Sequence, residues 1–442
     1  MQTLMRNAFV YTGDEKWRSF ADGTLLVEDD HIAWVGESAE WAVVASTNQF
    51  SPDLVLDMDG TVIIPGLINA HAHGGLSIHR GVCDDGDLFS WARRLAPHTS
   101  HLVEADLIFG CYLAIMEQVT SGTTCTCDCT RYGTSIFAQV SSVIGSRSLS
   151  GTLVNSPELR PEGRPNWPSA LEETEAALTE FSGTPRVRFF LGTHSPYNCT
   201  AELLIEVKQQ AERLGLPFNI HVAETHTEVV QVQIARGHRP VEWLDYLGLL
   251  DANCLIDHAV WLAPNEIEIL AQRGVAVAHC PVSNAKLASG IAPVPELRRA
   301  GVPVGLGTDS VLSQNSQDMF QEMKLAVLLQ RASRLNGSVL SARDAIRMAT
   351  LESARALQWA DEIGSISVGK QADLVVINLS HPQGLTAERV ESDLVYACGP
   401  HKVRTVLVAG EVIYDRGRFT RFDAEALKEQ IRHRYHHVQT ES

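Results

Sequence analysis

From Val62 onward, short apolar runs alternate with segments of helical periodicity, and this alternation restricts the fold more than any other feature of the sequence. The predicted strands are Val62–Asn69, Thr123–Cys129, Ser148–Asn155, Val187–His194, Phe218–Ala223, Cys254–His258, Val275–His279 and Val302–Asp309. The helical segments between them include Glu104–Thr120, Ala201–Leu214, Pro264–Gln272 and Gln317–Arg331. Most apolar runs are continuous, as in parallel strands buried on both faces. Eight β/α repeats over roughly 250 residues predict a closed (β/α)8 barrel of the α/β class.

The two ends of the chain have a different pattern. Residues 1–61 and 363–422 contain short β-type segments separated by turn signals such as Asp22-Gly23 and Asp29-Asp30. We expect them to combine into one small β-sandwich built from both chain ends. This gives residues 1–61 and 363–422 to the sandwich, residues 62–362 to the barrel, and residues 423–442 to a C-terminal helix and tail.

Composition restricts the partners and the compartment. The 442 residues include 36 basic and 53 acidic side chains, a net charge of −17, which argues against nucleic acid or an anionic membrane as the main partner. We find neither a secretory signal nor a window of ~18 apolar residues, so a cytoplasmic protein is expected. Nine cysteines are spread over the chain. We interpret the cluster Cys125, Cys127 and Cys129 as buried, reduced thiols rather than a zinc site, because no second cysteine pair follows it.

Metal-capable side chains stand where the predicted strands end. His71 and His73 lie two residues apart at the first strand end, so both rings point to the same face. The other strand ends carry His194, His221 with Glu224, His258, and Asp309. In a parallel barrel the carboxyl ends of the strands meet at one mouth, where chemistry collects. The sequence therefore predicts a metal site at this mouth.

These motifs resemble the amidohydrolase superfamily over nearly the whole chain. They are Pro65-Gly-Leu-Ile-Asn-Ala-His-Ala-His73, the His-x-x-Glu ending in Glu224, the strand-six His258, and Gly307-Thr-Asp309. His194 stands where binuclear members carry a carboxylated lysine, so the chain resembles the mononuclear branch. The resemblance implies that His71, His73, His221 and Asp309 bind one divalent metal per chain. Three nitrogens and one carboxylate suit zinc, with iron(II) as the alternative.

Within this branch, the sequence is most similar to S-adenosylhomocysteine/methylthioadenosine deaminases, guanine-type deaminases and s-triazine hydrolases. The segments that carry this likeness are 194–197, 279–287, 290–294 and 315–323. Adenosine-type deaminases of the branch hold the ribose with a carboxylate shortly after a Trp and a Pro. Here no acid follows Trp91 until Glu104, and Ser310 stands where relatives usually have glycine after the aspartate. Both departures put a ribosylated purine in doubt.

The implied chemistry is hydrolysis by activated water. A divalent metal lowers the pKa of bound water from about 15.7 toward about 7, and the resulting hydroxide attacks the ring. By resemblance, Asp309 takes the proton of that water, His258 contacts the hydroxide or the oxyanion, and Glu224 protonates a ring nitrogen. Two structural alternatives stay open: Glu224 as a helix-start carboxylate and His258 as a core histidine.

We therefore predict an aminohydrolase that releases ammonia from a small amino-substituted nitrogen heterocycle, such as a purine, a pterin or a nucleoside-like compound. The alternatives are removal of chloride or an alkylamine from an s-triazine-like ring and, from another class, a non-catalytic scaffold. The expected substrate contacts are His194, Trp91, His98 and Ser310. His79 either lines the mouth or is solvated. Trp and Leu residues on the outer helices would permit a homodimer or a higher homo-oligomer.

Overall fold

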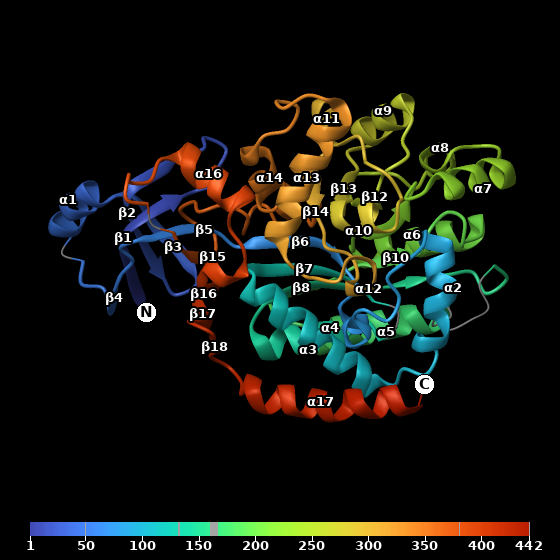
Figure 1. Cartoon of the computed structure of the whole chain (residues 1–442), viewed down its shortest axis with the longest axis horizontal. Coiled ribbons are helices and arrows are strands. Elements are labelled where there is room, and N and C mark those ends of the chain that lie inside the picture. Colours follow the sequence, from blue (N-terminus) through green and yellow to red (C-terminus); the bar gives the residue numbers. More distant parts are fainter. Residues whose placement is uncertain (49, 131–132, 160–166, 380, 442) are drawn as a thin grey trace.

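The computed structural model describes residues 1–48, 50–130, 133–159, 167–379 and 381–441, and its central element is a ring of parallel strands (Figure 1). In chain order these strands are β6 (Leu67–Ala72), β7 (Thr123–Thr130), β8 (Arg147–Val154), β10 (Leu191–Thr193), β11 (Phe218–Val222), β12 (Cys254–His258), β13 (Ala276–His279) and β14 (Val304–Leu306). A parallel bridge between Ala72 and Asp309 brings the first and last strands together. The predicted (β/α)8 barrel is confirmed.

Helices surround the barrel on its outside (Figure 1). They are η1 (Gly74–His79), α2 (Leu88–Thr99), α3 (Glu104–Thr120), α4 (Ile136–Ile144), α5 (Trp167–Glu180), α6 (Ala201–Leu214), α7 (His226–Arg236), α8 (Pro240–Tyr246), α9 (Pro264–Arg273), α10 (Pro281–Lys286), α11 (Val294–Arg299), α12 (Val311–Gln314), α13 (Met319–Arg334), α14 (Ala342–Met348) and α15 (Leu351–Ala356). Two of them, α3 and α6, have the predicted bounds. Local signals define α6, because the Thr200 hydroxyl accepts a hydrogen bond from the Leu203 amide and Gly215 ends the helix in a left-handed conformation.

The predicted first strand, residues 62–69, is two strands in the structure. Its first part is β5 (Thr61–Pro65), which pairs with strands from the chain ends, and only β6 belongs to the barrel. Gly66 separates them at a close approach, where a Cβ atom would lie 2.1 Å from the Thr124 hydroxyl oxygen. The prediction of one continuous barrel strand is therefore wrong for residues 62–65. Likewise, the run 187–194 divides into β9 (Val187–Phe189), which pairs with β8, and β10.

The two chain ends combine into one β-rich unit, as predicted for the small sandwich, and their strands form a second, mainly antiparallel sheet. Its order is β18 (Arg418–Phe419), β17 (Glu411–Asp415), β16 (Val403–Val408), β15 (Leu374–Asn378), β5, β1 (Gln2–Tyr11), β2 (Ser19–Glu28) and β3 (His31–Glu37), with β4 (Leu54–Asp57) beside β1. The helices α1 (Ser38–Asn48) and α16 (Ala387–Tyr396) and the turn η2 (Pro400–Lys402) accompany it. The sequence did not predict α1, whose Trp41 packs on Leu4 and Leu26.

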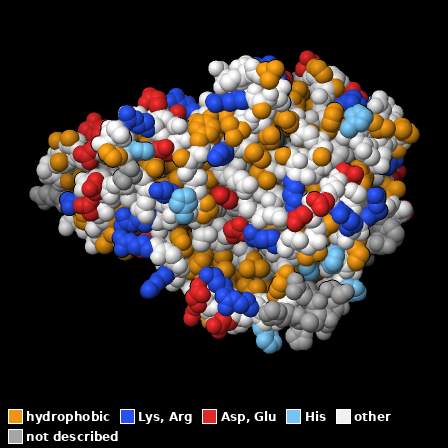
Figure 2. Space-filling view, viewed as in Figure 1, with side chains coloured by type: hydrophobic (Ala, Val, Ile, Leu, Met, Phe, Trp, Pro, Cys, Tyr) orange, Lys and Arg blue, Asp and Glu red, His pale blue; other side chains and the backbone are white. Residues whose placement is uncertain are grey.

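The C-terminal helix α17 (Ala424–Glu441) lies along the outside of the barrel (Figure 1). The Arg434 guanidinium pairs with the Asp106 carboxylate of α3, with Nε 2.6 Å from Oδ1. Among the described residues, no helix combines the length and apolarity needed to cross a membrane. On the face shown in Figure 2, basic side chains are interspersed with acidic ones.

Candidate metal centre

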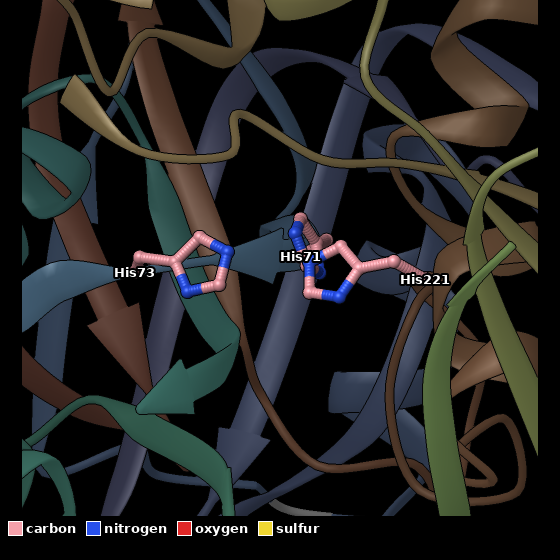
Figure 3. A group of neighbouring side chains, drawn as sticks. All are labelled: His71, His73 and His221. Carbon is pink, nitrogen blue, oxygen red and sulfur yellow. The ribbon is translucent and has the colours of Figure 1, made fainter. Parts of the chain in front are cut away.

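Three imidazoles meet at the carboxyl ends of the barrel strands. His71 lies on β6, His73 directly follows that strand, and His221 lies on β11; one ring nitrogen from each lies within 4.8 Å of the others. The His73 and His221 rings approach from opposite sides with His71 between them (Figure 3). His73 and His221 are nearly parallel, with centroids 5.5 Å apart, and the His71 ring is perpendicular to both. Sequence-distant strands thus place three nitrogens around one point.

Asp309 adds a carboxylate to this cluster. Its Oδ1 lies 3.3 Å from His73 Nε2 and 3.6 Å from His71 Nε2. Burial alone would raise the pKa of Asp309, but the adjacent His71 ring and the charges of His73 and His258 hold it well below its usual range. Asp309 and His258 both have positive φ, 61° and 71°, in a region that side-chain-bearing residues rarely adopt. Such strain is typical of functional sites.

Backbone carbonyls orient two of the imidazoles. The His221 Nδ1 lies 2.8 Å from the His194 carbonyl oxygen, and the His73 Nδ1 bonds the Cys129 carbonyl oxygen. A carbonyl can only accept, so each Nδ1 carries the proton and each Nε2 presents a lone pair. The His71 Nε2 is buried and has no hydrogen-bond partner among the described residues. An orphaned imidazole nitrogen beside two others and a carboxylate fits a divalent metal such as zinc or iron(II).

Glu224 and His258 adjoin the cluster. The ligand-capable atoms of His71, His258 and Asp309 lie within 4.8 Å of one another, and Glu224 Oε2 lies 4.0 Å from His258 Nε2. Burial raises the pKa of Glu224, which favours the protonated form that a general acid needs.

Other residues fill the structural role that was the alternative for Glu224. Thr225 caps α7, and the Glu228 carboxylate accepts hydrogen bonds from the backbone amides of Ala223 and Glu224 at 2.8 Å. The side chain of Glu224 is thereby left to face His258.

Sequence reasoning missed the side chains that hold the catalytic candidates in place. The hydroxyls of Ser283 and Ser313 donate to Asp309 Oδ2 at 2.5 and 2.7 Å. The Asn284 Oδ1 lies 2.9 Å from His258 Nδ1. Ser283 and Asn284 stand in the first turn of α10, within the motif His279–Leu287 that carries part of the family likeness. That motif was the available signal, but it does not show which side chain each residue reaches.

The predicted substrate contacts occupy different surroundings. The half-buried His194 ring lies 4.9 Å from the His221 ring, between centroids. Ser310 is buried and caps α12 by accepting from the Leu312 amide. Trp91 is buried in an apolar cluster and donates from Nε1 to the Cys83 carbonyl at 3.1 Å. His98 lies exposed in the last turn of α2.

His79 and the cysteine cluster of β7 are both buried. His79 is buried, so its interpretation as a solvated side chain is wrong. Burial and, to a lesser extent, the charge of His98 lower the pKa of His79. Cys125, Cys127 and Cys129 are buried and form no disulfide, as predicted.

A parallel barrel with histidines and an aspartate clustered at its carboxyl mouth defines a class of metal-dependent hydrolases. The model of the amidohydrolase family matches residues 62–413, and the chain belongs to this family. It is accordingly a hydrolytic enzyme that acts on carbon–nitrogen bonds, as predicted.

Relatives match the chain over nearly its full length. A 5-methylthioadenosine/S-adenosylhomocysteine deaminase of Nitratidesulfovibrio vulgaris is 38% identical and covers 97% of this chain and 96% of its own. A 5'-deoxyadenosine deaminase of Methanopyrus kandleri is 36% identical, covering 92% and 93%. These names confirm the predicted aminohydrolase class and argue against the scaffold alternative.

Solved structures share the fold. An adenosine deaminase from Xanthomonas campestris with bound zinc has a TM-score of 0.91 and 31% identity, covering 99% of this chain and 98% of its own. An atrazine chlorohydrolase from Arthrobacter aurescens with zinc has a TM-score of 0.88 at 21% identity, covering 98% and 100%. The second likeness shows the common fold alone.

Proposed function

We propose that this enzyme deaminates an adenosine-type nucleoside, with 5'-modified adenosines as the preferred substrates. The observation that carries the proposal is the joint arrangement of His71, His73, His221 and Asp309 in a chain whose full-length relatives are named adenosine-type deaminases. The missing carboxylate after Trp91 implies that another group binds the ribose, because no acid occurs before Glu104.

Zinc is the proposed metal, held by His71, His73, His221 and Asp309. The donor set and the unpartnered His71 Nε2 support it, as does the zinc in the adenosine deaminase structure. When bound, a divalent ion of this kind activates water and stabilises developing negative charge.

The chain's own residues then move protons. Asp309 receives a proton of the attacking water, while Ser283 and Ser313 hold its other oxygen. Glu224 donates a proton to the ring nitrogen next to the amine-bearing carbon, which makes that carbon electrophilic. His258, oriented by Asn284, contacts the oxygen that becomes the product carbonyl. The water oxygen forms the new carbon–oxygen bond, and Asp309 passes the proton it received to the amine. The carbon–nitrogen bond then breaks, ammonia leaves, and the remaining hydroxyl proton restores Glu224.

A substrate panel tests this proposal. Purified enzyme is depleted with a chelator, reloaded with zinc and assayed for ammonia release from adenosine, 5'-methylthioadenosine, S-adenosylhomocysteine and 5'-deoxyadenosine. Guanine, a pterin, and atrazine with chloride detection form the comparison arm. We expect the highest kcat/KM for a 5'-modified adenosine, loss of activity on depletion and recovery with zinc. Turnover of only the comparison arm contradicts the nucleoside proposal, and chloride release favours the s-triazine alternative.

The compartment and the assembly are also proposals. All nine cysteines lie within the described residues and none is in a disulfide, which suits the reducing cytoplasm. A homodimer or higher homo-oligomer is consistent with the outer helices, and analytical ultracentrifugation measures it directly.

A further inference from the structure

A layer of buried polar side chains lies directly beside the metal cluster. The Asp257 side chain, on β12, is fully buried, and its Oδ1 lies 3.1 Å from His71 Nδ1. The Asn219 side-chain amide donates to the same Oδ1 at 3.2 Å, and the Cys129 thiol lies 3.4 Å from Asn219 Oδ1 and 3.3 Å from His71 Nδ1. Strands β6, β7, β11 and β12 each contribute one member. On its other side, Cys129 belongs to an apolar cluster that includes Leu255 and Phe190.

His71 differs from the other two imidazoles in what holds its ring. The Nδ1 atoms of His73 and His221 bond neutral backbone carbonyls. The Nδ1 of His71 faces a carboxylate, which is an acceptor and carries charge. The orientation of His71 therefore depends on a side chain that mutation can change.

The hydrogen bonds of this layer have a consistent direction. The Asp257 carboxylate accepts, so His71 Nδ1 carries its proton and the lone pair lies on Nε2, the orphaned atom in the cluster. Asn219 donates to Asp257 through its amide nitrogen, and its oxygen accepts from the Cys129 thiol. The Asp257 carboxylate lies at hydrogen-bond distance from His71 Nδ1, and a carboxylate in this position both orients a ligating imidazole and makes it a stronger metal ligand.

We propose that Asp257 is a positioning residue that fixes the His71 tautomer and strengthens His71 as a ligand, with Asn219 holding the carboxylate and Cys129 holding Asn219. This inference rests on the metal centre of the proposed function and does not depend on the substrate.

The test is the zinc affinity of Asp257→Asn. The variant amide can donate to His71 Nδ1, which shifts the ring proton to Nε2, the atom that must ligate. We expect the zinc dissociation constant, measured by chelator competition, to rise about 10- to 100-fold. The d–d absorption spectrum of the cobalt(II)-substituted protein should change as well, because it reports the ligand field.

Controls separate positioning from misfolding. Cys127→Ala alters a fully buried side chain of β7, the strand that also carries Cys129, and should keep the zinc affinity of the wild type. Circular dichroism and the unfolding temperature of the metal-free proteins show whether Asp257→Asn folds. If it does not, the zinc affinity of Asn219→Ser is measured instead, and we expect a smaller loss of affinity. Unchanged zinc affinity and cobalt spectrum in a folded variant overturn the inference. Zinc binding without nucleoside deamination contradicts only the substrate proposal.

Discussion

Both oxygens of Asp309 are engaged by neighbouring side chains. One of its oxygens faces two imidazoles and the other accepts two serine hydroxyls, so its position is fixed by four side chains. These contacts keep the carboxylate ionised and in place. A residue with this environment can serve both as a ligand and as a proton acceptor.

Replacement of Asp309 by Asn should abolish turnover without unfolding the protein. The amide keeps the shape but loses the charge and the ability to accept a proton, so kcat should fall on the order of 10³-fold or more. Ammonia release and circular dichroism measure the two effects. The exposed Asp361→Asn variant should behave as the wild type. Activity retained in Asp309→Asn would remove this residue from the mechanism.

Glu224→Gln tests the general acid. The amide cannot protonate a ring nitrogen, so kcat should decrease on the order of 10²-fold or more. The matched control is Glu206→Gln, at an exposed position of α6. A nearly unchanged rate in Glu224→Gln would limit this residue to a structural role beside His258.

At the scale of elements, the packing of α3 on η1 supports the first two imidazoles. Gly110 of α3 faces the backbone of Gly75, and a Cβ atom at position 110 would lie 2.0 Å from the Gly75 carbonyl oxygen. Because η1 begins directly after His73, this close approach determines where the His71–His73 segment lies.

Gly110→Ala should therefore destabilise the protein. Overpacking against backbone should lower the free energy of unfolding by about 1–3 kcal/mol and weaken zinc binding. Urea unfolding and chelator competition measure the two effects. Gly337→Ala is the control, because no atom lies within 4 Å of the added methyl group. Equal stability of the two variants would show that η1 moves without cost.

At the scale of the whole molecule, a buried ion pair links the barrel to the terminal sheet. Arg147 of β8 donates from Nε and Nη2 to both oxygens of Asp373, at 2.7 and 2.8 Å, and both side chains are buried. Asp373 also accepts from the Ala409 amide at the end of β16. The pair thus sets the barrel against the sheet that both chain ends form.

Arg147→Met should lower the free energy of unfolding by about 3–5 kcal/mol, because it leaves the Asp373 carboxylate buried without its partner. Urea unfolding measures this loss. The double variant Arg147→Met/Asp373→Leu should recover much of it, since neither charge remains. A double variant no more stable than Arg147→Met would contradict this account.

Local signals in the sequence determined a large part of this protein. Continuous apolar runs gave the barrel strands, cap residues such as Thr200 and Gly215 defined α6, and strand-end side chains marked the metal cluster. These features are short-range, because periodicity, capping and strand ends are properties of neighbouring residues.

Only the tertiary structure decided which distant groups meet. It assigned residues 61–65 to the terminal sheet, where they pair with β1 and β15 from the two chain ends. It also placed Ser283 against Asp309 and Asp257 against His71, across 26 and 186 positions of the sequence. Such contacts depend on how eight strands close into one ring, and no local pattern carries that information.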